Sequence, residues 1–223
     1  MIVTEEKRLE KILGFLSPHK NILVVGCDGC TQPPRGLREA KTYAMLIEMG
    51  GKLQNKEFRC KPTTVAKQCD NHGCATTLTP QIEGIDAILS LACGAGVQTL
   101  VKVFSDIPVY PGQDTIFIGS QERENGNLYE MCRACGDCIL FETGGVCPIT
   151  RCAKGLLNGP CGGMYEGKCE VGHYERDCAW VLIYDRLKHL GMMDLFKEYK
   201  APRDNSKLQA QLREIVWVKE AKA

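Results

Sequence analysis

The sequence lacks any long unbroken apolar run, and its charges nearly cancel. No stretch reaches the roughly 20 apolar residues that a membrane-spanning helix needs, so we expect no membrane insertion. Lysine and arginine total 28 against 27 aspartates and glutamates, which leaves no single-sign field for nucleic acid or an acidic membrane surface. The opening residues, MIVTEEKRLEKILGF, contain no signal-peptide core. These absences predict a cytoplasmic protein that does not bind nucleic acid.

Residues of familiar catalytic sites are also scarce. The chain has four histidines and shows no constellation of histidine and carboxylate that meets the usual criteria for an active site. Gly94-Ala95-Gly96 is similar to part of a phosphate-binding loop, but the full dinucleotide pattern and its acidic partner are missing. An independent enzyme with its own catalytic site is therefore disfavoured.

Cysteine, in contrast, is abundant. The chain has 14 cysteines, and eight of them lie between Cys132 and Cys178, beginning with Cys132-x2-Cys135-x2-Cys138. Thiolates spaced by two residues can converge on one ion or cluster. A disulfide framework is the alternative, but it is typical of secreted chains rather than of a reducing cytosol. The cysteines therefore predict bound metal.

Apolar patterning predicts an α/β fold: a small parallel α/β domain of flavodoxin/Rossmann-like type, followed by a Cys-rich, loop-built metal module with C-terminal helices. Short apolar runs closed by glycine alternate with helical patterns, which implies right-handed crossovers in a parallel sheet. The expected elements are a helix with Thr4 as N-cap ending at Pro18, strands at 21–25, 63–66 and 86–91, helices at 37–49 (stopped by Gly50-Gly51) and 94–104, and short strands at 107–110 and 115–118.

Composition divides the chain further. We expect an N-terminal helix (1–19), the α/β domain with cysteine-lined strand ends (20–120), the Cys-rich iron–sulfur module with a helix (121–192), and a C-terminal tail helix (193–223). The module has few large apolar side chains, so bound metal should supply much of its folding free energy. Its helix begins at Cys178, and the tail is either a solvated helix or one that docks on a partner. The apolar positions of that module helix are Trp180, Ile183, Tyr184, Leu187 and Leu190, ended by Gly191, and those of the tail are Leu208, Leu212, Ile215 and Val216.

Four cysteines follow the expected strands. Cys27 and Cys30 come directly after the first strand, Cys69 after the strand at 63–66, and Cys93 after the strand at 86–91. Ligands of open parallel sheets bind at the carboxyl ends of the strands. These four thiolates could therefore meet around one metal centre, where the helix beginning near Gly94 would stabilise negative charge. The alternative is that they pack as small apolar side chains.

Three further residues have less definite roles. Cys60 and Cys74 fit no clear geometry and are expected to pack, although Cys74 could replace one ligand. His72 could coordinate metal, but a hydrogen-bonded turn histidine is the favoured interpretation.

The eight cysteines of the module suit two four-ligand sites. Bacterial ferredoxins follow the triple spacing with Cys-Pro after three residues, whereas here Cys147-Pro148 follows after eight. Cys147 could thus complete the first site or join the second group of cysteines. Iron–sulfur is favoured over zinc, because a zinc ribbon would pair two C-x2-C knuckles. That second group is Cys152, Cys161, Cys169 and Cys178.

Several of these segments resemble one family. SLACGAGVQ (90–98), RACGDCILFETGGVCPITRCAKGLLNGPCGGMYEGKCEV (133–171) and CAW (178–180) resemble the methylenetetrahydrofolate reductase C-terminal-type family, which in acetogens forms a small subunit. With VGCDGC and KQCD, the resemblance covers roughly residues 20–190.

The resemblance implies a non-catalytic, iron–sulfur electron-transfer subunit of a methylenetetrahydrofolate reductase complex in one-carbon metabolism. It would carry two to three 4Fe-4S clusters, with zinc possible at one site. Electrons would pass from an external donor, ferredoxin or another iron–sulfur protein, to FAD or FMN on a separate catalytic subunit. Such a subunit is a β/α barrel of about 250 residues, for which this chain is too short. Module loops and the Trp217 tail are the expected contacts with it. The alternative is a zinc-binding scaffold subunit without electron transfer.

Overall fold

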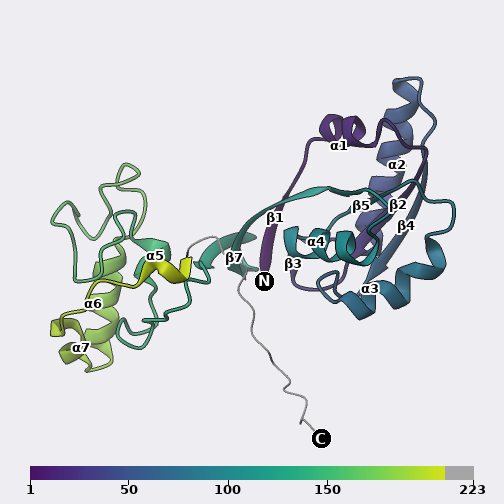
Figure 1. The fold of residues 1–223 in the computed structure, drawn as a ribbon. Helices are drawn as coiled ribbons and strands as arrows, with labels where there is room; N and C mark the ends of the chain where they lie inside the picture. The colour runs from purple at the N-terminus through teal and green to yellow at the C-terminus, as the bar shows by residue number, and fades with distance from the viewer. Residues whose placement is uncertain (209–223) are drawn as a thin grey trace, which may run out of the picture. The chain divides into compact units, whose positions relative to one another are not determined.

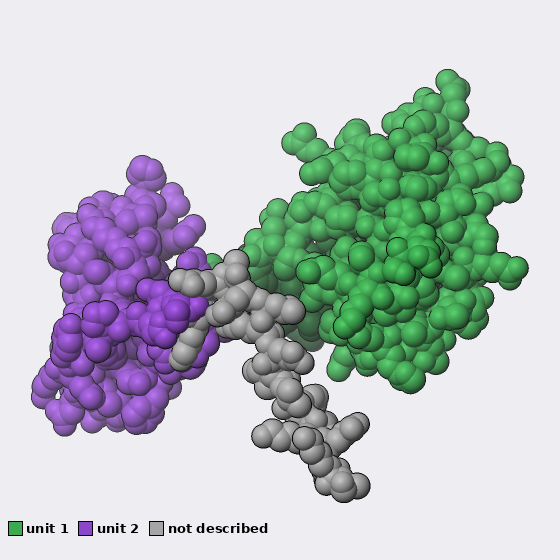
Figure 2. All heavy atoms as spheres, in the orientation of Figure 1, with its two compact units in different colours: residues 1–130 green, residues 131–223 purple. Residues whose placement is uncertain are grey.

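The computed structural model describes residues 1–208, which belong to two compact units (Figure 2). Unit 1 comprises residues 1–130, and unit 2 begins at Met131. Residues 209–223 of the predicted tail helix, including Leu212, Ile215 and Trp217, lie outside the described residues. No helix within residues 1–208 has the length and apolar composition needed to cross a bilayer.

Unit 1 contains the predicted α/β domain, built on a four-stranded parallel sheet in the order β4-β2-β5-β6. The short apolar runs form its central strands because both faces of a parallel sheet are covered. The parallel α/β class is therefore confirmed (Figure 1). The strands are β2 (Asn21–Cys27), β4 (Arg59–Val65), β5 (Ala87–Ser90) and β6 (Val109–Pro111), and the helices are α1 (Leu9–Leu16), α2 (Leu37–Leu53), α3 (Asn71–Leu78) and α4 (Gly94–Val103), with a 3-10 turn at Thr79–Gln81.

Two apolar cores cover the two faces of this sheet. Ile22 and Val24 of β2 pack with α1 and α2, whereas Leu23 and Val25 pack with α3 and α4. Alternate side chains of a strand point to opposite faces, so one fully buried strand joins the two cores. The result is a three-layer arrangement that leaves the carboxyl strand ends open for a site.

A second, mixed sheet replaces part of the predicted N-terminal helix. Its order is β3-β1-β7-β8. The prediction of Thr4 as a helix N-cap was wrong: Thr4 lies inside β1 and is buried. Strand β1 pairs antiparallel with β7, more than 100 residues away, and this non-local partner overrides the local helical pattern, which begins only at Leu9. The strands are β1 (Ile2–Glu6), β3 (Thr31–Gln32), β7 (Gln113–Glu122) and β8 (Asn127–Cys132).

The prediction that Gly50-Gly51 ends α2 was also wrong, since the helix runs through both to Leu53. The two glycines allow close packing instead. A Cβ at Gly50 would lie 2.7 Å from Cδ1 of Leu13, and one at Gly51 would lie 2.4 Å from Cδ2 of Phe58. Close packing against α1 and the start of β4 thus explains both residues.

Unit 2 is formed largely of loops around a small core. The polar stretch 121–127 lies at the end of β7 and in the turn leading to β8, so the cysteine-rich loops begin near residue 131. Trp180, Ile183 and Leu187 of the predicted helix are buried, and Gly191 follows its end as expected. The unit therefore has an apolar core of its own, which was not expected. Its helices are α5 (Pro148–Arg151), α6 (Ala179–His189) and α7 (Met193–Lys197), with a 3-10 turn at Asn205–Leu208.

Candidate metal centres

The carboxyl edge of the parallel sheet carries the first group of cysteines. Cys27 ends β2, Cys69 follows β4, and Cys93 is the N-cap of α4. Together with Cys30 they line one cavity of about 520 Å³. The structure thus brings together the four cysteines that the strand pattern placed at this edge.

A buried amide holds the strand ends around this cavity. Nε2 of Gln68 donates to the carbonyl oxygens of Val25 (2.8 Å) and Gly26 (2.9 Å), while its Oε1 accepts from the hydroxyl of Ser90 (2.6 Å). Gln68 and Ser90 are both fully buried. One side chain therefore links the segment after β4 to β2 and β5, the strands next to three of the four cysteines. Sequence reasoning missed this residue, because an isolated glutamine has no motif.

The electrostatics of the first cavity favour the protonated form of the Cys69 thiol. Partial burial raises the pKa of Cys69, and the neighbouring thiols of Cys27, Cys93 and Cys30 raise it further. Like charges close together disfavour ionisation. The amide of Gly94, at the start of α4, already donates to Oγ1 of Thr115 at 2.8 Å. A bound cation is thus the natural partner for ionised sulfur here.

The three residues with less definite roles, Cys60, Cys74 and His72, do not line this cavity. Cys74 is fully buried in α3, and its Sγ donates to the carbonyl oxygen of Gln68 at 3.3 Å. Burial raises the pKa of Cys74 to about 11, and burial together with nearby Glu48 raises that of Cys60 to about 12. Both therefore pack as neutral thiols, as expected. His72 is exposed in the first turn of α3 and does not line the cavity.

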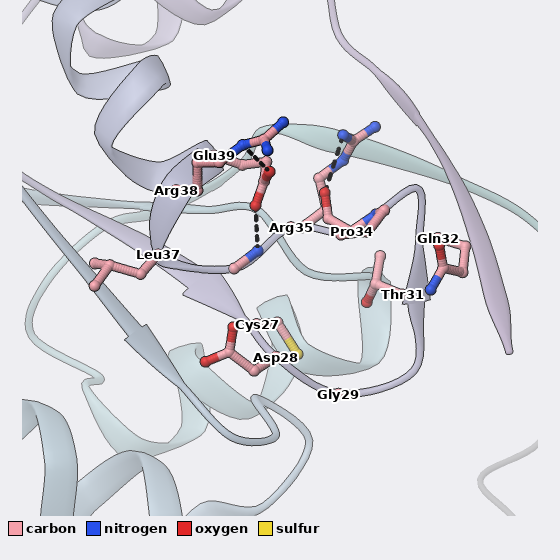
Figure 3. Close-up of a pocket in the computed structure, with 11 residues that line it drawn as sticks. Cys27, Asp28, Gly29, Thr31, Gln32, Pro34, Arg35, Leu37, Arg38 and Glu39 are labelled. Atoms are coloured by element: carbon pink, nitrogen blue, oxygen red, sulfur yellow. Dashed lines mark hydrogen bonds and ion pairs between the residues drawn. The ribbon is translucent and has the colours of Figure 1, made fainter.

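A charged pocket of about 360 Å³ adjoins Cys27 at the start of α2 (Figure 3). Oε2 of Glu39 accepts from the amide of Gly36 at 2.9 Å, and Oε1 pairs with Arg38 at 3.3 Å. Figure 3 shows Arg38 and Glu39 paired with one another, and Asp28 beside Cys27. Because these charged groups pair with residues of the pocket itself, their interactions stabilise the start of α2 and the loop after β2. The Gly-x-x-Glu spacing could have indicated it.

The second group of cysteines lies in unit 2. Cys132, Cys135, Cys138 and Cys147 line one cavity of about 240 Å³. Cys147, whose partner the sequence left open, therefore stands with the triple run. The connecting chain turns back through left-handed residues, and the amide of Ala134 (φ 50°) donates to Sγ of Cys132 at 3.3 Å.

Charge at this cavity favours an ionised thiol. Partial burial acts to raise the pKa of Cys135, but hydrogen bonding with the Asp137 backbone and with Arg203 outweighs it, so the pKa lies below its usual value. Thiolates are the form that binds metals. The cavity thus combines four sulfurs with a source of positive charge.

Among the last four cysteines, Cys152 lines a cavity of about 410 Å³ that Cys161, Cys169 and Cys178 do not line. Cys178 is the buried N-cap of α6, and Cys152 packs against the same core. Cys161 is exposed, with its Sγ 3.3 Å from Oε1 of Glu170. The amide of Cys169 donates to a carbonyl in a separate turn. These residues therefore remain a predicted ligand set, without support from a shared cavity.

Single-ion geometry is absent from both groups. Over residues 1–208, no three His, Cys, Asp or Glu side chains are arranged to hold a metal ion. The described cavities thus gather sulfurs without closing them on one point.

Comparison with known proteins bears on the cysteine-rich half. Residues 110–206 match a protein-family model described as methylene-tetrahydrofolate reductase C terminal. No curated protein and no solved structure matches the chain. The matched residues include strand β7, the second cysteine cavity and all eight cysteines of unit 2. The resemblance to the methylene-tetrahydrofolate reductase C-terminal family is therefore confirmed over residues 110–206.

Proposed function

We propose that this chain is the iron–sulfur electron-transfer subunit of a methylenetetrahydrofolate reductase complex, relaying electrons to the flavin of a separate catalytic subunit. One observation carries the proposal: Cys132, Cys135, Cys138 and Cys147 line a single cavity inside the segment that matches the family.

The donor set of this cavity fits a 4Fe-4S cluster. Four thiols, a backbone N–H donating to sulfur and a nearby guanidinium are the groups that hold and tune such clusters. A four-iron cluster spreads its thiolate ligands over a larger body than a zinc ion does. The triple cysteine spacing, with Cys147 in the same cavity, is therefore better matched to a cluster than to a zinc ribbon.

The bound cluster would supply one-electron transfer, for which flavin is the natural converter to a two-electron reduction. The chain's own residues hold the sulfurs in place: left-handed Gly136 and Ala134 reverse the backbone between the first three cysteines. Cys147 is presented at the start of α5, where Pro148 fixes the first helical residue. Cys27, Cys30, Cys69 and Cys93 would hold a further centre in unit 1, and Cys152, Cys161, Cys169 and Cys178 are the candidates for a third.

A separate catalytic subunit is part of the proposal. The strands described in residues 1–208 form two four-stranded sheets, neither of which is a closed β/α barrel. Folate reduction would therefore take place on a flavin-containing partner, with ferredoxin or another iron–sulfur protein as donor. The family match over residues 110–206 supports this pairing.

A structural zinc site is the second candidate, for the last four cysteines. Cys152 and Cys178 lie at the small apolar core of unit 2, where bound metal would stabilise folding rather than reach a redox partner. In this alternative the subunit shapes the complex without passing electrons.

Metal analysis of the anaerobically purified complex tests the proposal. We expect a brown protein containing iron and acid-labile sulfide, whose visible absorption bleaches on reduction. Cys135→Ser should remove one cluster signal in electron paramagnetic resonance (EPR), whereas Cys60→Ser, a packing control in unit 1, should leave all signals unchanged. Cys161→Ser should leave the signal lost in Cys135→Ser intact. A colourless protein containing only zinc would refute the relay.

A further inference from the structure

The segment after α7 returns to the second cysteine cavity. Nδ2 of Asn158 donates to the carbonyl oxygen of Lys200 (2.9 Å), and the amide of Lys200 donates to Oδ1 of Asn158 (2.7 Å). This reciprocal pair anchors the segment three residues before Arg203, and Arg203 itself lines the cavity. An arginine distant in sequence is thereby delivered to the cysteines.

The guanidinium of Arg203 contacts the cavity wall directly. Its Nη2 lies 3.1 Å from Sγ of Cys135 and donates to the carbonyl oxygen of Asp137 at 2.7 Å. The side chain is only 9% exposed, and a carboxylate oxygen of Asp137 lies 3.9 Å from its Nη2. Nη1 is buried and has no hydrogen-bond partner in the described structure.

Such an arrangement is unfavourable for an apolar or neutral cavity. A buried cation needs a counter-charge and acceptors for its N–H groups, yet the Asp137 carboxylate is half exposed and not in hydrogen-bond contact. Arginine remains charged and presents five donors in a plane. Negative charge on the sulfurs of the cavity would therefore stabilise this guanidinium.

We propose that Arg203 compensates the negative charge of the centre held by Cys132, Cys135, Cys138 and Cys147, and thereby raises its reduction potential. This inference rests on the proposed function. Reduction adds one negative charge to a cluster, and a nearby cation stabilises the reduced state more than the oxidised state. Hydrogen bonds to ligating sulfur act in the same direction.

Redox titration followed by EPR tests this role in the full complex. Arg203→Gln should shift the midpoint potential of the centre that Cys135→Ser abolishes to a lower value. Arg203→Lys keeps the charge and should remain closer to wild type. Lys197→Gln removes an equal charge from an exposed pair on α7 and should leave the potential unchanged. A purely structural arginine would instead show equal shifts for the lysine and glutamine variants.

The possible outcomes separate the two proposals. If wild type shows no iron–sulfur signal that Cys135→Ser removes, the proposed function fails. If that signal is present but Arg203→Gln keeps the wild-type potential, the charge role is overturned. Should Arg203→Gln not fold, Asn158→Ala decides, because it releases the Lys200 segment that holds Arg203 at the cavity and should lower the potential. An unchanged potential in that variant also overturns the role.

Discussion

Gln68 is expected to hold the first cysteine site together, and Gln68→Met tests this. Methionine has nearly the same length and shape but cannot form the three hydrogen bonds that Gln68 makes to Val25, Gly26 and Ser90. The perturbation therefore removes polar links between neighbouring strands while preserving most of the packing.

The expected loss of stability follows from these contacts. Each buried hydrogen bond contributes about 1 kcal/mol net, which gives about 3 kcal/mol for three. The carbonyl of Val25 still accepts from the amide of Leu91 at 2.9 Å, so it does not become an unsatisfied group. Burying the methionine tip recovers up to about 1 kcal/mol. We expect Gln68→Met to lower the free energy of unfolding of unit 1 by about 2–3 kcal/mol.

Urea unfolding of the metal-free chain provides the assay. Far-UV circular dichroism follows both units, whereas the two tryptophans, Trp180 and Trp217, lie outside unit 1 and report on the rest of the chain. Gln68→Met should lower the urea midpoint seen by circular dichroism and leave the midpoint seen by tryptophan fluorescence unchanged. In protein purified with its metal, the metal content at Cys27, Cys30, Cys69 and Cys93 should also fall, because the strand ends lose the hydrogen bonds that link them.

A matched control is Gln98→Met on α4. Gln98 is exposed and bonds only to the carbonyl of Gly94, at 3.1 Å. Its substitution should change stability by less than about 0.5 kcal/mol. If Gln68→Met changes the free energy of unfolding as little as this control, the hydrogen bonds of Gln68 do not hold the strand ends together.

Three further predictions concern other positions. Gly51→Ala should destabilise unit 1 by about 1–3 kcal/mol, because the new Cβ would overpack against Phe58. Gly14→Ala in α1 should stabilise it by about 0.5–1 kcal/mol, because no atom lies within 4 Å of the new Cβ. Thermal unfolding that ranks the two variants in the other order would contradict the packing explanation. Burial raises the pKa of Cys60 from 9.0 to about 12, so above about pH 9 this thiol stays protonated in the folded chain but ionises in the unfolded chain. The free energy of unfolding should therefore fall above about pH 9, and the fall should be shallower in Cys60→Ala. Trp180→Phe removes the indole hydrogen bond to a backbone carbonyl (3.1 Å) and should lower the stability of unit 2 by about 1 kcal/mol in calorimetry, and no change would indicate that this bond is dispensable.

Local patterns predicted those elements whose burial follows directly from their own residues. The run Asn21–Cys27 forms a central strand because a continuous branched apolar segment suits a sheet covered on both faces. Thr4 shows the limit: its strand exists through pairing with β7, which no local window contains. The pair Gly50-Gly51 predicts a helix end, yet contacts with Leu13 and Phe58 explain both glycines inside the helix.

The candidate sites divide in the same way. Cys27, Cys69 and Cys93 could be assigned to one edge, because parallel strands with right-handed crossovers place their carboxyl ends together. The grouping of Cys147 could not, because eight intervening residues permit several loop paths. Arg203 gave no signal at all, since its relation to Cys135 exists only in space.

By itself, the sequence determined the α/β class, the abundance of thiols and the family of the cysteine-rich segment, because periodicity and motif spacing are local properties. Tertiary structure alone decided that Cys147 lines the same cavity as the triple run, that Gln68 links the strand ends by hydrogen bonds and that a buried guanidinium lies beside Cys135. These depend on loop closure and on pairing between distant segments, whose free energies arise only when the chain is folded.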